Sequence, residues 1–284
     1  MTGDLIDAAG NPAPFVDDRD FTLYLGDALE VLPLLADDSV DAVVTSPPYL
    51  DARPEYDDIR VFEYPLLFQE LARVCTGGML WNVGRIWRGG IEQLWWLELI
   101  RAASICGWEH WDTGVWIKPN ANPIHGRVFA DAHEFVLVFG RDGVRFNEDA
   151  IRRPHAESTL ARFARPWREH RGVKNTPAKD RKTTGRPAPH PLGARPYSFF
   201  VAHVGREKGN PHPAPMALDL ADDLVSLACW AGQTILDPFA GSGTTGIAAR
   251  RQQRRSVLIE KREEYARLSA TRLAQQSVFA ECVA

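Results

Sequence analysis

The sequence of 284 residues has no long apolar run and few cysteines. No stretch approaches the roughly 18 consecutive apolar residues that indicate a membrane-spanning helix. The N-terminus lacks a basic segment followed by an apolar one, so we expect no export signal and a cytoplasmic location. The cysteines are Cys75, Cys106, Cys229 and Cys282. Because they form no Cys-x-x-Cys pair, we expect reduced thiols and no metal site.

The net charge is only −4, but the charge is distributed unevenly. Residues 141–210 contain 16 Lys and Arg against 7 Asp and Glu, which gives this block +9 and leaves −13 for the rest of the chain. A basic block inside an acidic protein indicates a surface that meets a polyanion, and phosphate is the natural candidate. On composition alone, the block could also be a disordered basic loop.

Apolar periodicity predicts alternating strands and helices. Expected strands are residues 22–25, 40–45, 79–83, 109–117, 134–139, 256–259 and a strand beginning at 234. Expected helices are residues 28–35, 64–74, 91–105, 216–229 and 263–274. Strands that alternate with helices favour a doubly wound, mostly parallel α/β sheet.

The most informative pattern is Thr45-Ser46-Pro47-Pro48-Tyr49, which follows the apolar residues 40–44. Neither proline can donate to a sheet ladder and each restricts the residue before it, so a strand here ends abruptly in a stiff loop. Open α/β sheets place their ligands at the carboxyl ends of strands. The loop offers a hydroxyl, carbonyl oxygens and an aromatic face, which suit a planar base whose amino group must be held. Taken alone, the five residues could also form a buried turn.

A second pattern, residues 234–246, reads as a strand, a glycine turn and a helix. Gly241, Gly243 and Gly246 have the spacing G-x-G-x-x-G, and the next strand ends in Glu260, an acid at the distance that ribose binding needs. The glycine spacing alone is also typical of nicotinamide enzymes. Asp237, in the Asp-Pro-Phe before the glycines, favours another ligand, because its carboxylate would repel a pyrophosphate but can receive the ammonium of an amino-acid-like ligand.

Together the two motifs resemble those of the amino-methylating DNA methyltransferases that use S-adenosylmethionine. The Ser-Pro-Pro-Tyr motif precedes the Phe-x-Gly-x-Gly motif, which is the order of the beta group of that family, and the resemblance covers residues 20–275. It implies a Rossmann-like sheet with an inserted basic target-recognition region. The implied organisation is a catalytic part at 1–144, the insertion at 145–205 and a cofactor-binding part at 206–284.

The resemblance also implies roles for single residues. Ser46 and Pro47 would hold the exocyclic amine of the target base through a hydroxyl and a carbonyl, and Tyr49 would stack on the base once it has left the duplex. The implied catalytic residues are Ser46, Pro47, Pro48 and Tyr49. The implied cofactor-binding residues are Asp27, Thr45, Met216, Asp237, Phe239, Gly241, Gly243, Thr244 and Glu260. Asp27 and Thr244 could equally cap helices, and Phe239 could be core.

The implied partner is duplex DNA. In the family the basic insertion reads the DNA sequence, so its cations would divide between phosphate contacts and base contacts. The unranked candidates are Arg152, Arg153, Arg165, Arg168, Arg171, Lys174, Arg181 and Lys182. A cognate restriction endonuclease that acts separately is a further candidate partner, and both a monomer and a homodimer stay open.

Ser46 bears on the target base. In the family, Ser before Pro-Pro-Tyr is typical of cytosine-N4 enzymes, whereas Asp or Asn is typical of adenine-N6 enzymes. We therefore predict a cytosine-N4 DNA methyltransferase, with adenine N6 as the close alternative and RNA as an open substrate. Two alternatives come from other classes. The first is a nicotinamide-dependent oxidoreductase, which would have no use for the Ser-Pro-Pro-Tyr loop or the basic block. The second is a DNA-binding module without catalytic activity, and the intact residues of both motifs argue against it.

Overall fold

The computed structural model describes residues 6–7, 12–49, 63–120, 129–164, 188–204 and 215–281. They fall into two compact units. The large unit is Met1–Asn147 together with Tyr197–Ala284, and the small unit is Glu148–Pro196. Within the described residues, no helix is both long enough and apolar enough to cross a lipid bilayer.

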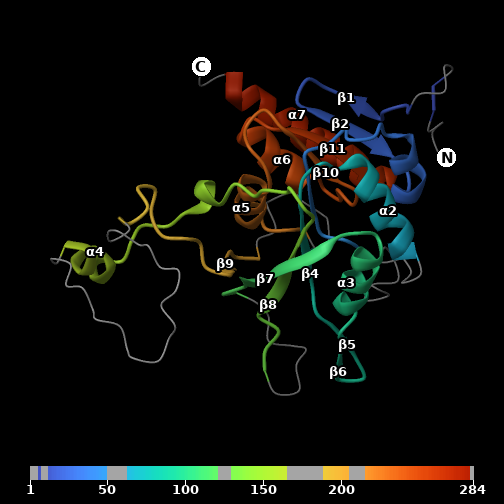
Figure 1. The fold of residues 1–284 in the computed structure, drawn as a ribbon. Coiled ribbons are helices and arrows are strands. Elements are labelled where there is room, and N and C mark those ends of the chain that lie inside the picture. The colour runs from blue at the N-terminus through green and yellow to red at the C-terminus, as the bar shows by residue number, and fades with distance from the viewer. Residues whose placement is uncertain are drawn as a thin grey trace. The chain divides into compact units, whose positions relative to one another are not determined.

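The large unit is built on a sheet whose described strands have the order β1-β2-β11-β10-β3-β4-β8-β7-β9 (Figure 1). The strands are β1 (Val16–Asp17), β2 (Phe21–Leu25), β3 (Ala42–Thr45), β4 (Met79–Val83), β7 (Glu109–Ile117), β8 (His133–Gly140), β9 (Phe199–Val201), β10 (Thr234–Asp237) and β11 (Arg255–Glu260). Strands β2, β11, β10, β3 and β4 run parallel. Strand β8 runs antiparallel to both of its neighbours. The predicted doubly wound, mostly parallel sheet is confirmed.

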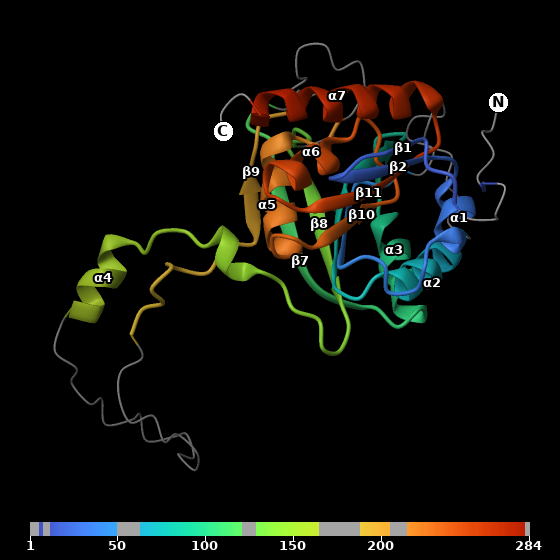
Figure 2. The ribbon, with the colours of Figure 1, turned by 90° about the horizontal axis from the view of Figure 1, so that it is seen from above.

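Helices cover both faces of this sheet (Figure 2). One face carries α1 (Ala28–Val31), α2 (Tyr64–Val74) and α3 (Trp96–Ile105), and the other carries α5 (Leu218–Ala228), α6 (Thr244–Arg251) and α7 (Glu263–Glu281). Successive side chains of a strand point to opposite faces. Accordingly, Val43 joins the core beneath α2, whereas Val44 joins the core beneath α5. Strand β3 is buried along its whole length for this reason.

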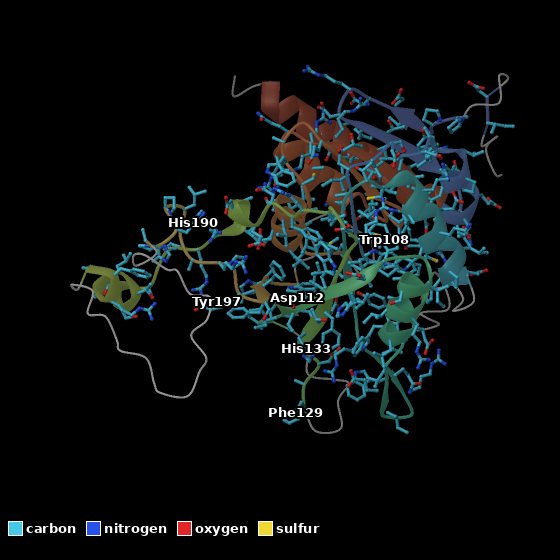
Figure 3. The ribbon with its side chains drawn as sticks, in the orientation of Figure 1. Trp108, Asp112, Phe129, His133, His190 and Tyr197 are labelled. Atoms are coloured by element: carbon cyan, nitrogen blue, oxygen red, sulfur yellow. The ribbon has the colours of Figure 1, made fainter. Side chains whose placement is uncertain are left out.

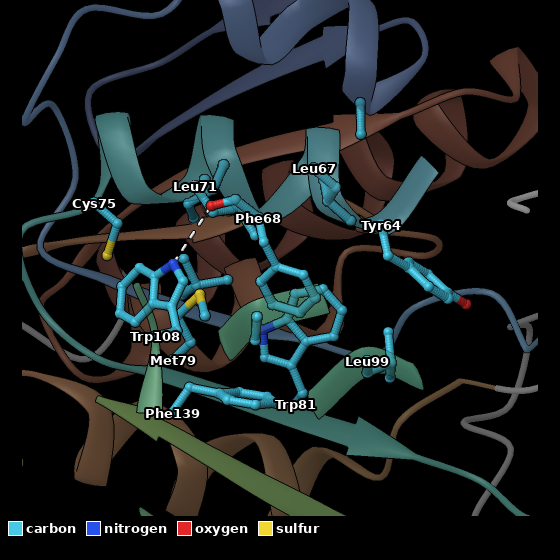
Figure 4. Close-up of a cluster of buried hydrophobic side chains, with 14 of the residues drawn as sticks. Tyr64, Leu67, Phe68, Leu71, Cys75, Met79, Trp81, Leu99, Trp108 and Phe139 are labelled. Carbon is cyan, nitrogen blue, oxygen red and sulfur yellow. Dashed lines mark hydrogen bonds between the residues drawn. The ribbon is translucent and has the colours of Figure 1, made fainter. Parts of the chain in front are cut away.

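Aromatic packing fixes β4 beneath α2. The rings of Trp81 and Phe68 stack with centroids 4.8 Å apart, and Phe139 of β8 contacts both rings edge-on. Trp108 donates its indole N–H to the Phe68 carbonyl (Figure 4). These contacts hold β4 and β8 side by side, and the carboxyl end of β4 lies beside the amino end of β8 because the two strands are antiparallel.

Three predicted helices differ from the structure by more than two residues, and the last of them, expected at 263–274, extends as α7 to Glu281. The helix expected at residues 91–105 begins only at Trp96, because residues 86–93 form a hairpin of β5 (Ile86–Arg88) and β6 (Ile91–Gln93). Gly89 and Gly90 both have positive φ, which makes the two-residue turn of such a hairpin possible. The helix expected at 28–35 is α1 followed by a 3₁₀ turn, η1 (Leu32–Leu34), that contains Pro33.

The small unit contains η3 (Glu148–Ile151) and α4 (Glu157–Ala164). Its two chain segments meet where Arg153 and Ala194 exchange backbone hydrogen bonds. The unit lies within the insertion predicted at residues 145–205, and its function as a target-recognition region remains a prediction.

Candidate active site

A cavity of about 420 Å³ lies at the carboxyl ends of β2, β3, β10 and β11. The parallel strands bring both predicted motifs to this edge of the sheet, because β3 pairs directly with β10. The lining includes most of the predicted site residues: Asp27, Ser46, Pro47, Pro48, Tyr49, Met216, Asp237, Phe239, Gly241, Thr244 and Glu260. Thr45 and Gly243 are not among the lining residues, and both support the wall from behind.

Asp237 is the buried centre of this wall, with a residue exposure of 2%. Its carboxylate accepts hydrogen bonds from the Thr45 hydroxyl at 2.6 Å, the Thr245 hydroxyl at 2.6 Å and the Phe239 N–H at 3.1 Å. Burial raises the pKa of Asp237, and these three donors oppose that shift. The carboxylate therefore joins the Ser-Pro-Pro-Tyr strand, the glycine turn and α6. Its predicted contact with a ligand ammonium remains a prediction.

Two further carboxylates, Glu260 at the end of β11 and Asp27 after β2, accept hydrogen bonds from backbone N–H groups. Glu260 accepts the Gly241 N–H and the Arg262 N–H, each at 2.8 Å, and burial raises the pKa of its carboxyl. Asp27 caps α1 by accepting the Leu29 N–H at 2.8 Å, and it lies 3.1 Å from the Lys261 ammonium. The structure thus shows the capping role that the sequence left open for Asp27. The cofactor contacts of both acids remain predictions.

Gly243 gives the glycine turn its shape. It precedes α6 in a left-handed conformation, with φ of +79°. A Cβ atom at this position would lie 2.2 Å from the Ser269 hydroxyl of α7, so the turn and α7 approach each other closely. Ser269 is fully buried, and its hydroxyl has no hydrogen-bond partner among the described residues. The turn and α7 therefore meet here in van der Waals contact, and a hydrogen bond between them comes from Arg272 of α7, which donates to the Ser242 carbonyl.

Replacing Gly243 by alanine is expected to lower the free energy of unfolding by at least about 2 kcal/mol, from left-handed strain and the clash with Ser269. Urea denaturation measures this change. Ser269→Ala should be nearly neutral alone, because its hydroxyl has no described partner, and should recover part of the loss in the double variant. A G243A protein as stable as the parent would contradict the close approach.

The cavity fits S-adenosylmethionine on its own chemistry. Its volume lies within the roughly 300–1,000 Å³ of small-molecule sites. Apolar groups such as Phe239, Met216 and Ile259 offer surface to an adenine ring and a methionine chain. The carboxylates of Asp27 and Glu260 on the same wall suit a ligand that carries hydroxyls and positive charge. Gly241 of the glycine turn also lines the cavity.

Sequence reasoning missed several residues of this site. Thr245 is the second hydroxyl on Asp237, and Tyr265, Lys261 and Gly26 also line the cavity. The sequence pointed only weakly to Thr245, because the residue directly follows Thr244, a predicted cofactor-binding residue of the glycine motif. Tyr265 had none, because only the packing of α7 brings it to the strand ends.

The Ser-Pro-Pro-Tyr loop forms the side of the cavity next to β4. The Ser46 and Tyr49 hydroxyls lie 3.4 Å apart, and the Tyr49 hydroxyl donates to Glu134 at 3.1 Å. The Tyr49 ring lies against Trp95, with centroids 5.5 Å apart. The Ser-Pro-Pro-Tyr motif is therefore supported by residues outside it: Glu134 of β8 and Trp95, which precedes α3.

The predicted DNA-binding cations are described only in part. Arg152 and Arg153 belong to the small unit, and the other six candidates lie outside the described residues. The Arg152 guanidinium binds Asp149 and the Gly193 carbonyl, and its side chain is only 11% exposed. Arg153 donates to the Arg195 carbonyl. Both arginines hold backbone of their own unit, and a contact with DNA remains a prediction for each.

Comparisons with known proteins identify the family of this chain. A family model described as DNA methylase, N6_N4_Mtase, matches residues 40–271. The type II methyltransferase M.ScaI of Streptomyces caespitosus is 27% identical over 93% of this chain and 84% of its own length. The solved structure of a DNA modification methylase from Thermus thermophilus, complexed with S-adenosyl-L-methionine, is 25% identical, with a TM-score of 0.58 over 89% of this chain and 93% of that chain. The solved structure of the cytosine-N4-specific PvuII DNA methyltransferase superposes with a TM-score of 0.65 at 20% identity, over 91% of this chain and 88% of that chain. The type II methyltransferase M.PvuII of Proteus hauseri is 22% identical over 92% of this chain and 85% of its own length.

The fold and the cavity define an S-adenosylmethionine-dependent methyltransferase. Because the family match spans most of the sequence, the chain belongs to the N6/N4 DNA methylase family. The resemblance inferred from the two motifs is confirmed, and the protein is a DNA methyltransferase that uses S-adenosylmethionine. The nicotinamide-dependent oxidoreductase is thereby set aside.

Proposed function

We propose that this enzyme methylates the exocyclic N4 of a cytosine that has been flipped out of duplex DNA. The observation that carries the choice of base is Ser46, which follows β3 and lines the cavity beside the glycine turn. A serine at this position is typical of the cytosine-N4 enzymes of the family. The adenine-N6 reaction is the alternative, because both bases present an exocyclic amine to the same loop.

The residues of the loop would activate that amine by geometry. The nitrogen lone pair is delocalised into the ring, so the amine is a poor nucleophile until acceptors hold its hydrogens. The Ser46 hydroxyl and the Pro47 carbonyl supply two acceptors, and the Tyr49 ring supplies a stacking surface. S-adenosylmethionine, when bound, supplies an electrophilic methyl group. Positioning and fixed dipoles would then provide most of the rate.

The basic block supports duplex DNA as the substrate. We assign the sequence reading to residues 145–205, where cations outnumber acids. Cations that neutralise phosphates make binding strongly dependent on salt concentration. M.ScaI and M.PvuII are named type II methyltransferases, which supports a role beside a separate restriction endonuclease.

Incubation with S-adenosylmethionine and mixed-sequence duplex DNA, followed by nucleoside mass spectrometry, tests the proposal. We expect N4-methylcytosine. N6-methyladenine would keep the enzyme class and overturn the choice of base. A methylated nucleoside from RNA but none from DNA would overturn the choice of substrate. The absence of any product, despite cofactor binding, would count against the reaction on the DNA tested and would lead to a search for the recognition sequence.

A further inference from the structure

The Tyr49 hydroxyl lies between the Ser46 hydroxyl and the carboxylate of Glu134. Tyr49 donates to Glu134 Oε2 at 3.1 Å, and its oxygen is 3.4 Å from Ser46 Oγ. The second oxygen of Glu134, Oε1, binds the Lys118 ammonium at 3.0 Å. The side chains of Lys118 and Glu134 are only 10% and 14% exposed, so this pair is largely removed from water.

These contacts follow from the sheet. Glu134 is the second residue of β8, directly after His133, which Figure 3 labels. Lys118 follows the end of β7, and β7 and β8 pair antiparallel, with Ile117 opposite His133. Strand β8 also pairs with β4, whose carboxyl end lies near the Ser-Pro-Pro-Tyr loop because β4 neighbours β3. The neighbouring strands β4, β8 and β7 thus bring the Lys118–Glu134 ion pair to the Tyr49 hydroxyl of the Ser-Pro-Pro-Tyr loop.

The Tyr49 ring is held in place independently of its hydroxyl. A Cβ atom at Gly84 would lie 2.3 Å from the ring, so the glycine permits the close approach. Trp95 packs on the ring and donates its indole N–H to the Gly84 carbonyl at 2.9 Å. Because the ring is fixed by packing, the hydroxyl points to Glu134 from a defined position.

Ser46, Tyr49, Glu134 and Lys118 form a row of polar side chains, and the direction of the hydrogen bonds along this row has a chemical consequence. A serine hydroxyl can either donate or accept, whereas an ionised carboxylate only accepts. The Glu134 carboxylate, paired with the Lys118 ammonium, accepts the Tyr49 hydrogen bond, which leaves the Tyr49 oxygen as an acceptor. Ser46 can then donate its own proton to Tyr49 and keep its lone pairs for the N–H of the target amine. The 3.4 Å separation is long for such a bond, and catalytic hydrogen bonds often tighten when substrate binds.

We propose that Glu134 is a positioning residue that acts through Tyr49 to set Ser46 as a hydrogen-bond acceptor for the target amine. This inference deepens the proposed function and rests on the role of Ser46 in it. It applies to an adenine amine as well as to a cytosine amine, since both donate N–H to the same hydroxyl.

The test is a double-variant cycle on the single-turnover rate of methyl transfer, with whichever amine the parent enzyme methylates. Tyr49→Phe removes the hydrogen bond to Glu134. Glu134→Gln reverses it, because the amide oxygen must face the Lys118 ammonium and the amide NH₂ then faces Tyr49. Each variant should lower the rate about tenfold, as for one lost hydrogen bond to a charged group. The double variant should be no slower than Y49F, because Glu134 acts only through the hydroxyl. S-adenosylmethionine affinity should stay unchanged, and Glu98→Gln, an exposed site on α3, is the matched control.

Additive losses in the cycle would assign Glu134 a merely structural role and overturn the inference. A Y49F enzyme at the parent rate would also overturn it, and this variant keeps the packed ring even if E134Q fails to fold.

A second readout does not need activity. The chain has 6 tyrosines, so the ¹³Cζ resonance of Tyr49 can be assigned in tyrosine-labelled protein by comparison with Y49F. E134Q should shift this resonance upfield, because the phenol loses an anionic acceptor, and E98Q should leave it in place. An unmoved resonance contradicts the inference. If the parent methylates RNA and no DNA base while this shift occurs, the proposed DNA substrate fails and the hydrogen bond stands.

Discussion

Ser46→Ala is expected to lower the single-turnover rate of methyl transfer by roughly 100- to 1,000-fold, the cost of removing one aligned polar group from a reacting centre. Ser46 lines the cavity, and its hydroxyl lies 3.4 Å from that of Tyr49. The substitution removes a single oxygen atom and adds none. Cofactor affinity should be preserved, because the glycine turn and Asp237 are untouched.

Rapid-quench assays with enzyme in excess over DNA measure this loss. Ser46→Thr is the matched control, since it keeps a hydroxyl at the same carbon and should retain more activity than S46A. In an S46A background, Tyr49→Phe should cause little further loss, because the tyrosine hydroxyl would have no serine to orient. An S46A enzyme that transfers methyl groups at the parent rate would remove Ser46 from the reaction.

Asp237→Ala is expected to weaken S-adenosylmethionine binding by at least about 100-fold and to lower the free energy of unfolding by about 3 to 5 kcal/mol. Alanine would leave the hydroxyls of Thr45 and Thr245 and the N–H of Phe239 buried without their acceptor. Unsatisfied buried donors cost about 1–3 kcal/mol each. The strand end and the glycine turn would lose their common anchor, so the cavity wall would change shape.

Isothermal titration calorimetry and urea denaturation measure the two effects. Asp237→Asn is the control, since its Oδ1 can keep Thr45 and Phe239 while the Thr245 hydroxyl rotates to accept from the amide. We expect D237N to lose much less stability than D237A. If it also binds the cofactor as tightly as the parent, the negative charge of Asp237 is not needed for binding. Parent-like binding by D237A would contradict the structural account of the wall.

Different parts of the site were accessible to sequence reasoning to different degrees. The Ser-Pro-Pro-Tyr loop and the glycine turn were predictable because their residues are adjacent and their backbone constraints are local. The hairpin at 86–93 was missed, although the Gly89-Gly90 pair was a local signal for its turn. Residues 91–105 fit helical periodicity as one segment, and the interpretation was wrong only for the residues before Trp96.

Contacts between distant segments were not predictable in this way. Thr45 appeared among the cofactor-binding residues, yet its hydroxyl binds Asp237, a residue 192 positions away, behind the cavity wall. Glu134 belongs to neither sequence motif. Its contact with Tyr49 spans 85 positions and depends on the order of β3, β4 and β8 in the sheet.

The sequence by itself determined the class of fold, the family and the two loops that carry its motifs, because prolines, glycines and apolar periodicity act over a few residues. Only the tertiary structure decided what supports those loops: the Asp237 hydrogen bonds, the contact of Gly243 with Ser269, and the row from Ser46 to Lys118. The physical reason is that strand order and helix packing determine which side chains meet, and no local pattern encodes the distance between them.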